Sequence, residues 1–149
     1  MRLVANGLAI CVLSLACVYA YAVGPNDNPT ALTVLQVKAN QAQPRDRCFL
    51  YAKLVSQMTD LAGQQFNSGE SGRASETLKL VQQYAEKIHI GIAGDSKKLK
   101  DAELLMQRTS FRLKGILGAA SFEDRQALEM TLKQLDQVQA QLMTQVFEH

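Results

Sequence analysis

The middle of this 149-residue chain carries an apolar seam at helical spacing, which constrains the fold more than any other feature. Its members recur at intervals of four and three residues: Ala74, Leu78, Val81, Ala85, Ile88 and Ile92. This spacing places them on one buried face of an α-helix. Val81 and Ile88 are therefore expected to be buried. Gln82 and Gln83 fall outside the seam, so replacing either by Ala is expected to be nearly neutral.

The same phase returns further along, at Leu99, Ala102, Met106, Leu113 and Ile116. Two interpretations are open, because Gly91, Gly94 and Asp95 between the two runs are poor helix residues. The unchanged phase favours one continuous or gently bent helix from Gly72 to Leu117, roughly 69 Å long at 1.5 Å per residue. The alternative is a break near Gly94, after which the two halves fold back on each other.

Two shorter segments before this seam also have helical signals. Asn28 is a capping residue before Pro29, which suits the first position of a helix. Pro44 disfavours helical backbone at the residue before it and suits the first turn of a new helix. The second helix should therefore run from about Pro44 to Asn67, where it meets a Gly- and Ser-rich turn over residues 67–72.

A last helix is predicted from Ser121 to the C-terminus, because Ser121 with Asp124 resembles a capping box. Its apolar stripe comprises Leu128, Leu132, Leu135, Val138, Leu142 and Val146. Residues 72–117 carry nine Lys or Arg against five Asp or Glu, while residues 121–149 carry two against five, which favours antiparallel packing of the two elements. Together these patterns predict an all-α fold: an elongated bundle of about four helices with a long central helix.

The N-terminus predicts export. Arg2 is the only charge before an apolar run that ends in Ala20-Tyr21-Ala22, with small residues at the two positions that a signal peptidase reads. We expect residues 1–22 to be a signal peptide, residues 23–149 to be a single helical-bundle domain, and the protein to be periplasmic or secreted. Two alternatives remain: lipidation of Cys17, after a sequence that loosely resembles a lipoprotein box, or an uncleaved membrane anchor.

Charge and cysteine content limit the classes of partner that this chain is expected to bind. The formal charge of +2 falls to +1 without Arg2, which argues against binding to nucleic acid. We expect membrane contact only if Cys17 is lipidated or the signal is uncleaved. Cys48 would be the only thiol of the mature chain, and its apolar neighbours favour burial over pairing with another molecule.

No constellation of residues points to a reaction. Glu86-Lys87-Ile88-His89 is half of a di-iron carboxylate pattern, but the only other His is His149, so a structural His is the better interpretation. The basic cluster Lys97-Lys98-Leu99-Lys100 is interpreted as a solvated face, because acids flank it. We predict no catalytic, metal-ligating or cofactor-binding residue, no cofactor and no enzymatic activity.

Two short parts of the sequence resemble known protein families. A set of positions resembles one tetratricopeptide-type helical hairpin: Leu61, Ala62, Phe66, Gly69, Ala74 and Leu78. Leu32-Thr33-Val34-Leu35-Gln36 matches the LTxxQ motif of Spy-like periplasmic chaperones, and Met130 to Gln134 differs from it at the first residue. The second resemblance implies a dimeric cradle that shields unfolded envelope proteins.

The sequence thus favours an exported, non-enzymatic helical scaffold or protein-interaction protein that has a protein partner and could form a homodimer. A Spy-like periplasmic chaperone is the first alternative, and a tetratricopeptide-like adaptor is the second.

Overall fold

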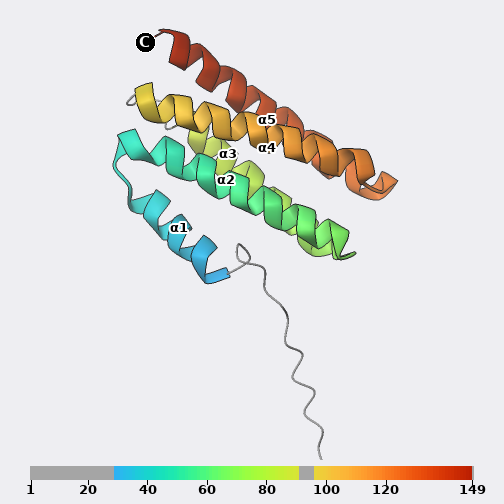
Figure 1. The fold of residues 1–149 in the computed structure, drawn as a ribbon. Helices are drawn as coiled ribbons and strands as arrows, with labels where there is room; N and C mark the ends of the chain where they lie inside the picture. The colour runs from blue at the N-terminus through green and yellow to red at the C-terminus, as the bar shows by residue number, and fades with distance from the viewer. Residues whose placement is uncertain (1–28, 91–95, 149) are drawn as a thin grey trace, which may run out of the picture.

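The computed structural model describes residues 29–90 and 96–148, and this part of the chain is all-helical (Figure 1). Its helices are α1 (Pro29–Gln41), α2 (Pro44–Asn67), α3 (Ser71–Ile90), α4 (Ser96–Ala119) and α5 (Phe122–Glu148). The all-α prediction is confirmed here, with five helices where about four were expected. The predicted signal peptide, residues 1–22 with Cys17, lies outside the described residues.

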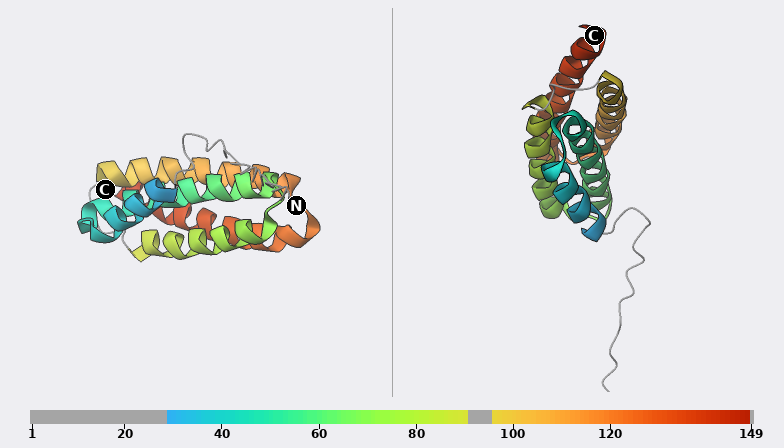
Figure 2. Two further views of the ribbon diagram at one scale, coloured as in Figure 1. Left: turned by 90° about the horizontal axis from the view of Figure 1, so that it is seen from below. Right: turned by 90° about the vertical axis from the view of Figure 1, so that its left-hand side faces the viewer.

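The five helices form two layers (Figures 1 and 2). Helices α2 and α3 make one hairpin, and α4 and α5 make a second. The hairpins stack so that α2 lies against α4 and α3 against α5, while α1 packs on α2. One layer therefore holds α1, α2 and α4, and the other holds α3 and α5.

The two hairpins stack in parallel. Lys98 at the start of α4 bonds to Asp46 at the start of α2, 52 positions earlier, and Arg112 further along α4 pairs with Asp60 further along α2. Helix α4 therefore runs in the same direction as α2. It runs antiparallel to α5, as predicted, and the Lys114 ammonium lies 3.5 Å from the Asp136 carboxylate. Helix α3, the other half of the element predicted to pack antiparallel, runs parallel to α5.

The predicted long central helix is wrong: α3 ends at Ile90 and α4 begins at Ser96. The bounds fit the alternative, a break near Gly94, and α4 runs in the opposite direction to α3, but the backbones of these two helices lie diagonally across the bundle and do not pack side by side. The seam keeps its phase because both helices point their apolar faces into one core. The matching apolar spacing before and after residues 91–95 therefore reflects a shared core and does not require a single helix.

The turn between α2 and α3 has the backbone geometry that its glycine permits. Gly69 has a φ of 76°, in the left-handed region that side chains with a Cβ rarely adopt. The N–H of Glu70 donates to the carbonyl of Gln65 at 2.8 Å, and the N–H of Gly69 donates to that of Phe66 at 3.0 Å. These two bonds form a Schellman motif, which satisfies the last carbonyls of α2 and reverses the chain.

The predicted helix starts are confirmed where the structure describes them. Pro44 opens α2 after Gln43, whose backbone is extended at φ −61° and ψ 149°. At the start of α5 the hydroxyl of Ser121 accepts the backbone N–H of Asp124 at 3.3 Å and donates to its carboxylate at 2.6 Å. The side chain of Asp124 also accepts a hydrogen bond from Ser71 at 3.1 Å, which links the two hairpins.

The core lies between the two layers and takes residues from all five helices. Nine of the predicted seam residues are buried: Ala74, Leu78, Val81, Ala85, Ile88, Leu99, Ala102, Met106 and Leu113. Ile116 is partly buried, and Ile92 lies outside the described residues. Val81 and Ile88 have no exposed surface, as predicted. None of the described helices combines the length and the apolarity that crossing a membrane would require.

Candidate interaction surface

The Glu-x-x-His pattern singled out from the sequence lies on α3. Glu86 is exposed on α3, and His89 follows it three positions later on the same helix. Within residues 29–90 and 96–148, no group of three or more His, Cys, Asp or Glu side chains is placed to hold a metal ion.

The basic cluster at the start of α4 splits between different environments. Lys98 donates to the carboxylate of Asp46 and so joins α4 to α2. This hydrogen bond lowers the pKa of Asp46, with the charges of Lys98 and Arg45 acting in the same direction. Leu99 is buried in the core and Lys100 is exposed. Lys98 therefore attaches α4 to α2, while Lys100 faces solvent, as expected for a solvated face.

Cys48 is buried, as the sequence predicted, with 2% of its surface exposed. Loss of water around the thiol raises its pKa to about 11. A thiol needs its thiolate form to act as a nucleophile, so at neutral pH this side chain behaves as a small apolar group.

An aromatic corner formed by α2 and α3, near Cys48, attaches α1. The rings of Tyr51 and Tyr84 lie 6.0 Å apart, and the Lys87 ammonium lies 4.8 Å from the centroid of the Tyr84 ring. The hydroxyl of Tyr51 donates to the Asn40 side chain of α1 at 3.0 Å. The two buried tyrosines are covered by the exposed side chains of Asn40 and Lys87, and these contacts join α1, α2 and α3, so this corner has a structural role.

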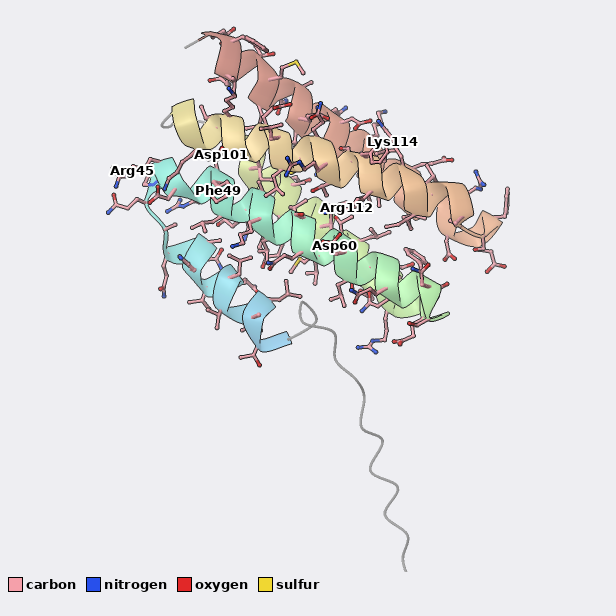
Figure 3. The ribbon with its side chains drawn as sticks, viewed as in Figure 1. Arg45, Phe49, Asp60, Asp101, Arg112 and Lys114 are labelled. Atoms are coloured by element: carbon pink, nitrogen blue, oxygen red, sulfur yellow. The ribbon has the colours of Figure 1, made fainter. Side chains whose placement is uncertain are left out.

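A groove of about 500 Å³ runs between α2 and α4 on the outside of the bundle. Its lining comes from four residues of each helix: Phe49, Lys53, Ser56 and Gln57 of α2, and Asp101, Leu104, Leu105 and Arg108 of α4. Figure 3 labels Phe49 and Asp101 at this interface, with Asp60 and Arg112 further along the same two helices. Phe49, Leu104 and Leu105 give the groove its apolar surface, and Lys53, Asp101 and Arg108 bring charge to it.

The outer stripe of α4, defined as Asp101, Leu104, Arg108, Phe111 and Gly115, shares its first three residues with this groove and continues along the helix beyond it. These residues recur every three or four positions and so share one face of the helix. Leu104 is 39% exposed and Phe111 is 78% exposed. A single exposed apolar residue is ordinary on a protein surface. Two on one stripe, beside an apolar groove, form a surface that another protein could cover.

An ion pair anchors α4 to α2 near this groove. The Nε of Arg112 lies 3.1 Å from Asp60, and its Nη2 donates to the hydroxyl of Ser56 at 2.5 Å. Burial raises the pKa of Asp60, because the loss of solvent outweighs the opposing effect of the Arg112 charge. Arg112 is thus committed to the fold, whereas Arg108, one turn earlier, faces the groove.

Sequence reasoning missed this surface. The spacing of the outer stripe could have been read from the sequence, because it repeats every three or four residues on the face opposite to the seam. The groove itself could not, because it requires α2 and α4 to lie side by side.

Comparisons with protein-family models, with curated proteins and with solved structures find no match to this chain. The resemblances to Spy-like chaperones and to a tetratricopeptide-type hairpin therefore stay predictions. Their residues lie on helices, Leu32 to Gln36 on α1 and Met130 to Gln134 on α5, with Gln134 donating to the backbone of Gln82 at 2.9 Å.

Proposed function

We propose that this protein is an exported, non-enzymatic helical scaffold that binds another protein through the α2–α4 groove and the outer stripe of α4. The observation that carries the proposal is the exposure of Leu104 and Phe111 on one face of α4, beside the half-buried apolar side chains of Phe49 and Leu105. Covering this surface removes apolar area from water, which is the main driving force of protein association.

The residue types on this surface also support binding. Aromatic residues and arginine are enriched among the side chains that contribute most to protein interfaces. Phe49 and Arg108 line the groove, and Phe111 lies about one turn beyond Arg108 on the outer stripe of α4.

The test is a photoreactive phenylalanine analogue placed at position 111 in cells that produce the protein. We expect a cross-linked adduct of defined mass. The matched control is the same analogue at position 122, because Phe122 is 91% exposed but lies at the α4–α5 turn. The absence of an adduct at position 111, or equal adducts at both positions, contradicts the proposal.

The same experiment separates the alternatives. A Spy-like chaperone would give many adducts of different mass, and the purified protein would suppress aggregation of an unfolded client. A tetratricopeptide-like adaptor gains support from the parallel stacking of two hairpins, since α-solenoids also stack helix pairs. The tetratricopeptide repeat is 34 residues long. In this chain Asp46 and Lys98, which pair across the two stacked hairpins, lie 52 positions apart.

Export is part of the proposal and has its own test. N-terminal sequencing of the protein recovered outside the cytoplasm should begin at Val23. A protein that starts at a lipidated Cys17, or that retains Met1 in the membrane, contradicts it.

A further inference from the structure

We infer that the partner element bound by this surface is an acidic amphipathic helix lying along the outer stripe of α4. This inference rests on the proposed function and specifies the chemistry of the partner. It is carried by the charges that the fold leaves unpaired, by the spacing of the stripe and by a glycine that the fold itself does not require.

The first argument is charge. The two acids that α2 contributes to this side, Asp46 and Asp60, are already paired with Lys98 and Arg112 of α4. The groove lining that remains has two cations, Lys53 and Arg108, against the single carboxylate of Asp101. A partner that brings acidic side chains to both flanks of its apolar face would therefore meet an excess of positive charge.

The wider distribution of charge supports the same partner. Helices α2 and α4 together carry nine Lys or Arg against four Asp or Glu, whereas α5 carries two against five. Helix α4 alone carries six Lys or Arg against two Asp or Glu, so pairing it with α4 of a second copy would oppose two basic helices, which is unfavourable. The charge therefore favours a different, acidic chain.

The second argument is geometry. Asp101 and Gly115, the ends of the outer stripe, are separated by about 21 Å along the helix axis at 1.5 Å per residue. Leu104 and Phe111 lie two turns apart between them. An amphipathic helix of about four turns presents apolar residues at the same spacing, which is a recurring mode of recognition in grooves.

The third argument is Gly115. A glycine inside a helix costs roughly 1 kcal/mol relative to alanine. A Cβ added at Gly115 would meet nothing within 4 Å, so no contact within the described chain requires a glycine there. It lies on the outer stripe, one turn beyond Phe111, where the absence of a side chain lets a second helix approach the backbone of α4.

The experiment uses two designed helical peptides of roughly 18 residues, long enough to form a helix when stapled. Both carry leucines at spacings of three and four. One has glutamates on both flanks of the leucine face and the other has lysines. Fluorescence anisotropy measures the affinity of each for the protein in the form that its cell produces. We expect the glutamate peptide to bind at least tenfold more tightly than the lysine peptide.

Variants locate the site. Phe111→Ala should weaken binding of the glutamate peptide about tenfold, while Phe122→Ala leaves it unchanged. Arg108→Glu should reverse the preference between the two peptides. Gly115→Leu should weaken binding, because the added side chain keeps the partner helix away from the backbone of α4. Its thermal stability should not fall. Melting curves of each variant establish that the fold is intact.

Equal affinity for the two peptides, or an unchanged preference in Arg108→Glu, overturns the inference. If cross-linking at position 111 still yields a defined adduct, the proposed function stands and the partner is not an acidic helix. If cross-linking also fails, the proposed function fails with it.

Discussion

The two hairpins meet at two interfaces that are held by different chemistry. Where α2 meets α4, the polar contacts are ion pairs between half-exposed side chains, Asp46 with Lys98 and Asp60 with Arg112. Where α3 meets α5, hydrogen bonds join the helices instead: Gln82 and Gln134 bond through neutral groups, and Ser71 donates to the carboxylate of Asp124. The Gln82 amide donates to the Thr131 hydroxyl at 2.7 Å.

The difference explains why only one of these interfaces is proposed to bind a partner. Hydrogen bonds at α3–α5 occupy their donors and acceptors, and three of the seven residues that line the adjoining hollow are glutamines. Ion pairs at α2–α4 hold the helices together at points along the interface and leave apolar side chains exposed between them. Such pairs are weak and are screened by salt. The four predictions below test this contrast.

The largest expected effect comes from a substitution that disrupts the core on which both interfaces depend. Val81→Asp would bury an unpaired charge at a position with no exposed surface, and it should lower the free energy of unfolding by about 4 kcal/mol or more. Urea denaturation measures the loss. Gln83→Asp is the matched control, because Gln83 is exposed on the same helix. Equal stability of the two variants would mean that the helical phase of α3 is wrong.

Cys48 reports opening of the core independently of either interface. Because burial raises its pKa to about 11, the folded protein should react slowly with a thiol reagent and the unfolded protein quickly. Cys48→Ala should lower the free energy of unfolding by about 1 kcal/mol or somewhat more through lost packing. Rapid labelling of the folded protein, or a covalent dimer that disappears in Cys48→Ala, would show that this thiol is accessible.

Gln82→Ala tests the α3–α5 interface. The sequence alone predicts no effect, but the structure gives the Gln82 side chain a bond to Thr131, so its loss should cost about 1 kcal/mol. This cost should not depend on salt, because neither group is charged. Thermal denaturation at low and high salt measures it, with Gln83→Ala as the control. If Gln82→Ala were as stable as Gln83→Ala, the hydrogen bond to Thr131 would not stabilise the fold, and the contrast between the α3–α5 and α2–α4 interfaces would fail.

The smallest effects concern the charged interface, where the two carboxylates should respond in opposite directions. The pKa of Asp46 is lowered, so its charged form stabilises the fold above the ordinary pKa of an Asp, and this stabilisation is lost as the pH falls through the lowered value. The pKa of Asp60 is raised, so ionisation disfavours the folded state, and acidification toward the raised value relieves that cost.

Substitution should separate these two effects. Asp46→Asn should lower the melting temperature slightly at neutral pH and less so at high salt, while Asp60→Asn should leave it unchanged or raise it. Thermal melts at neutral pH and near pH 4 compare the two variants. A loss of stability in Asp60→Asn as large as that in Asp46→Asn would contradict the assignment.

Much of the fold follows from local signals in the sequence. Pro44 marks the start of α2, Gly69 marks its end, and the spacing of Val81 and Ile88 assigns the buried face of α3. These features depend on backbone geometry and helical period, which neighbouring residues determine. The burial of Cys48 follows from its apolar neighbours in the same way.

The remainder depends on which helices become neighbours. The unchanged phase of the seam concealed the separation of α3 from α4, because two helices that face one core keep the same pattern as one. Gln82 lies outside the seam, but α5 places Thr131 beside it. The groove between α2 and α4 likewise exists only once the hairpins stack.

The parallel stacking of the hairpins has a consequence for how the chain folds. Each hairpin closes through a turn of a few residues, whereas the hydrogen bonds between the hairpins join positions 49 to 56 apart. Closing a longer loop costs more chain entropy, and contacts distant in sequence slow folding. The hairpins should therefore form early and dock late, so that the rate of folding is governed by the meeting of two preformed halves.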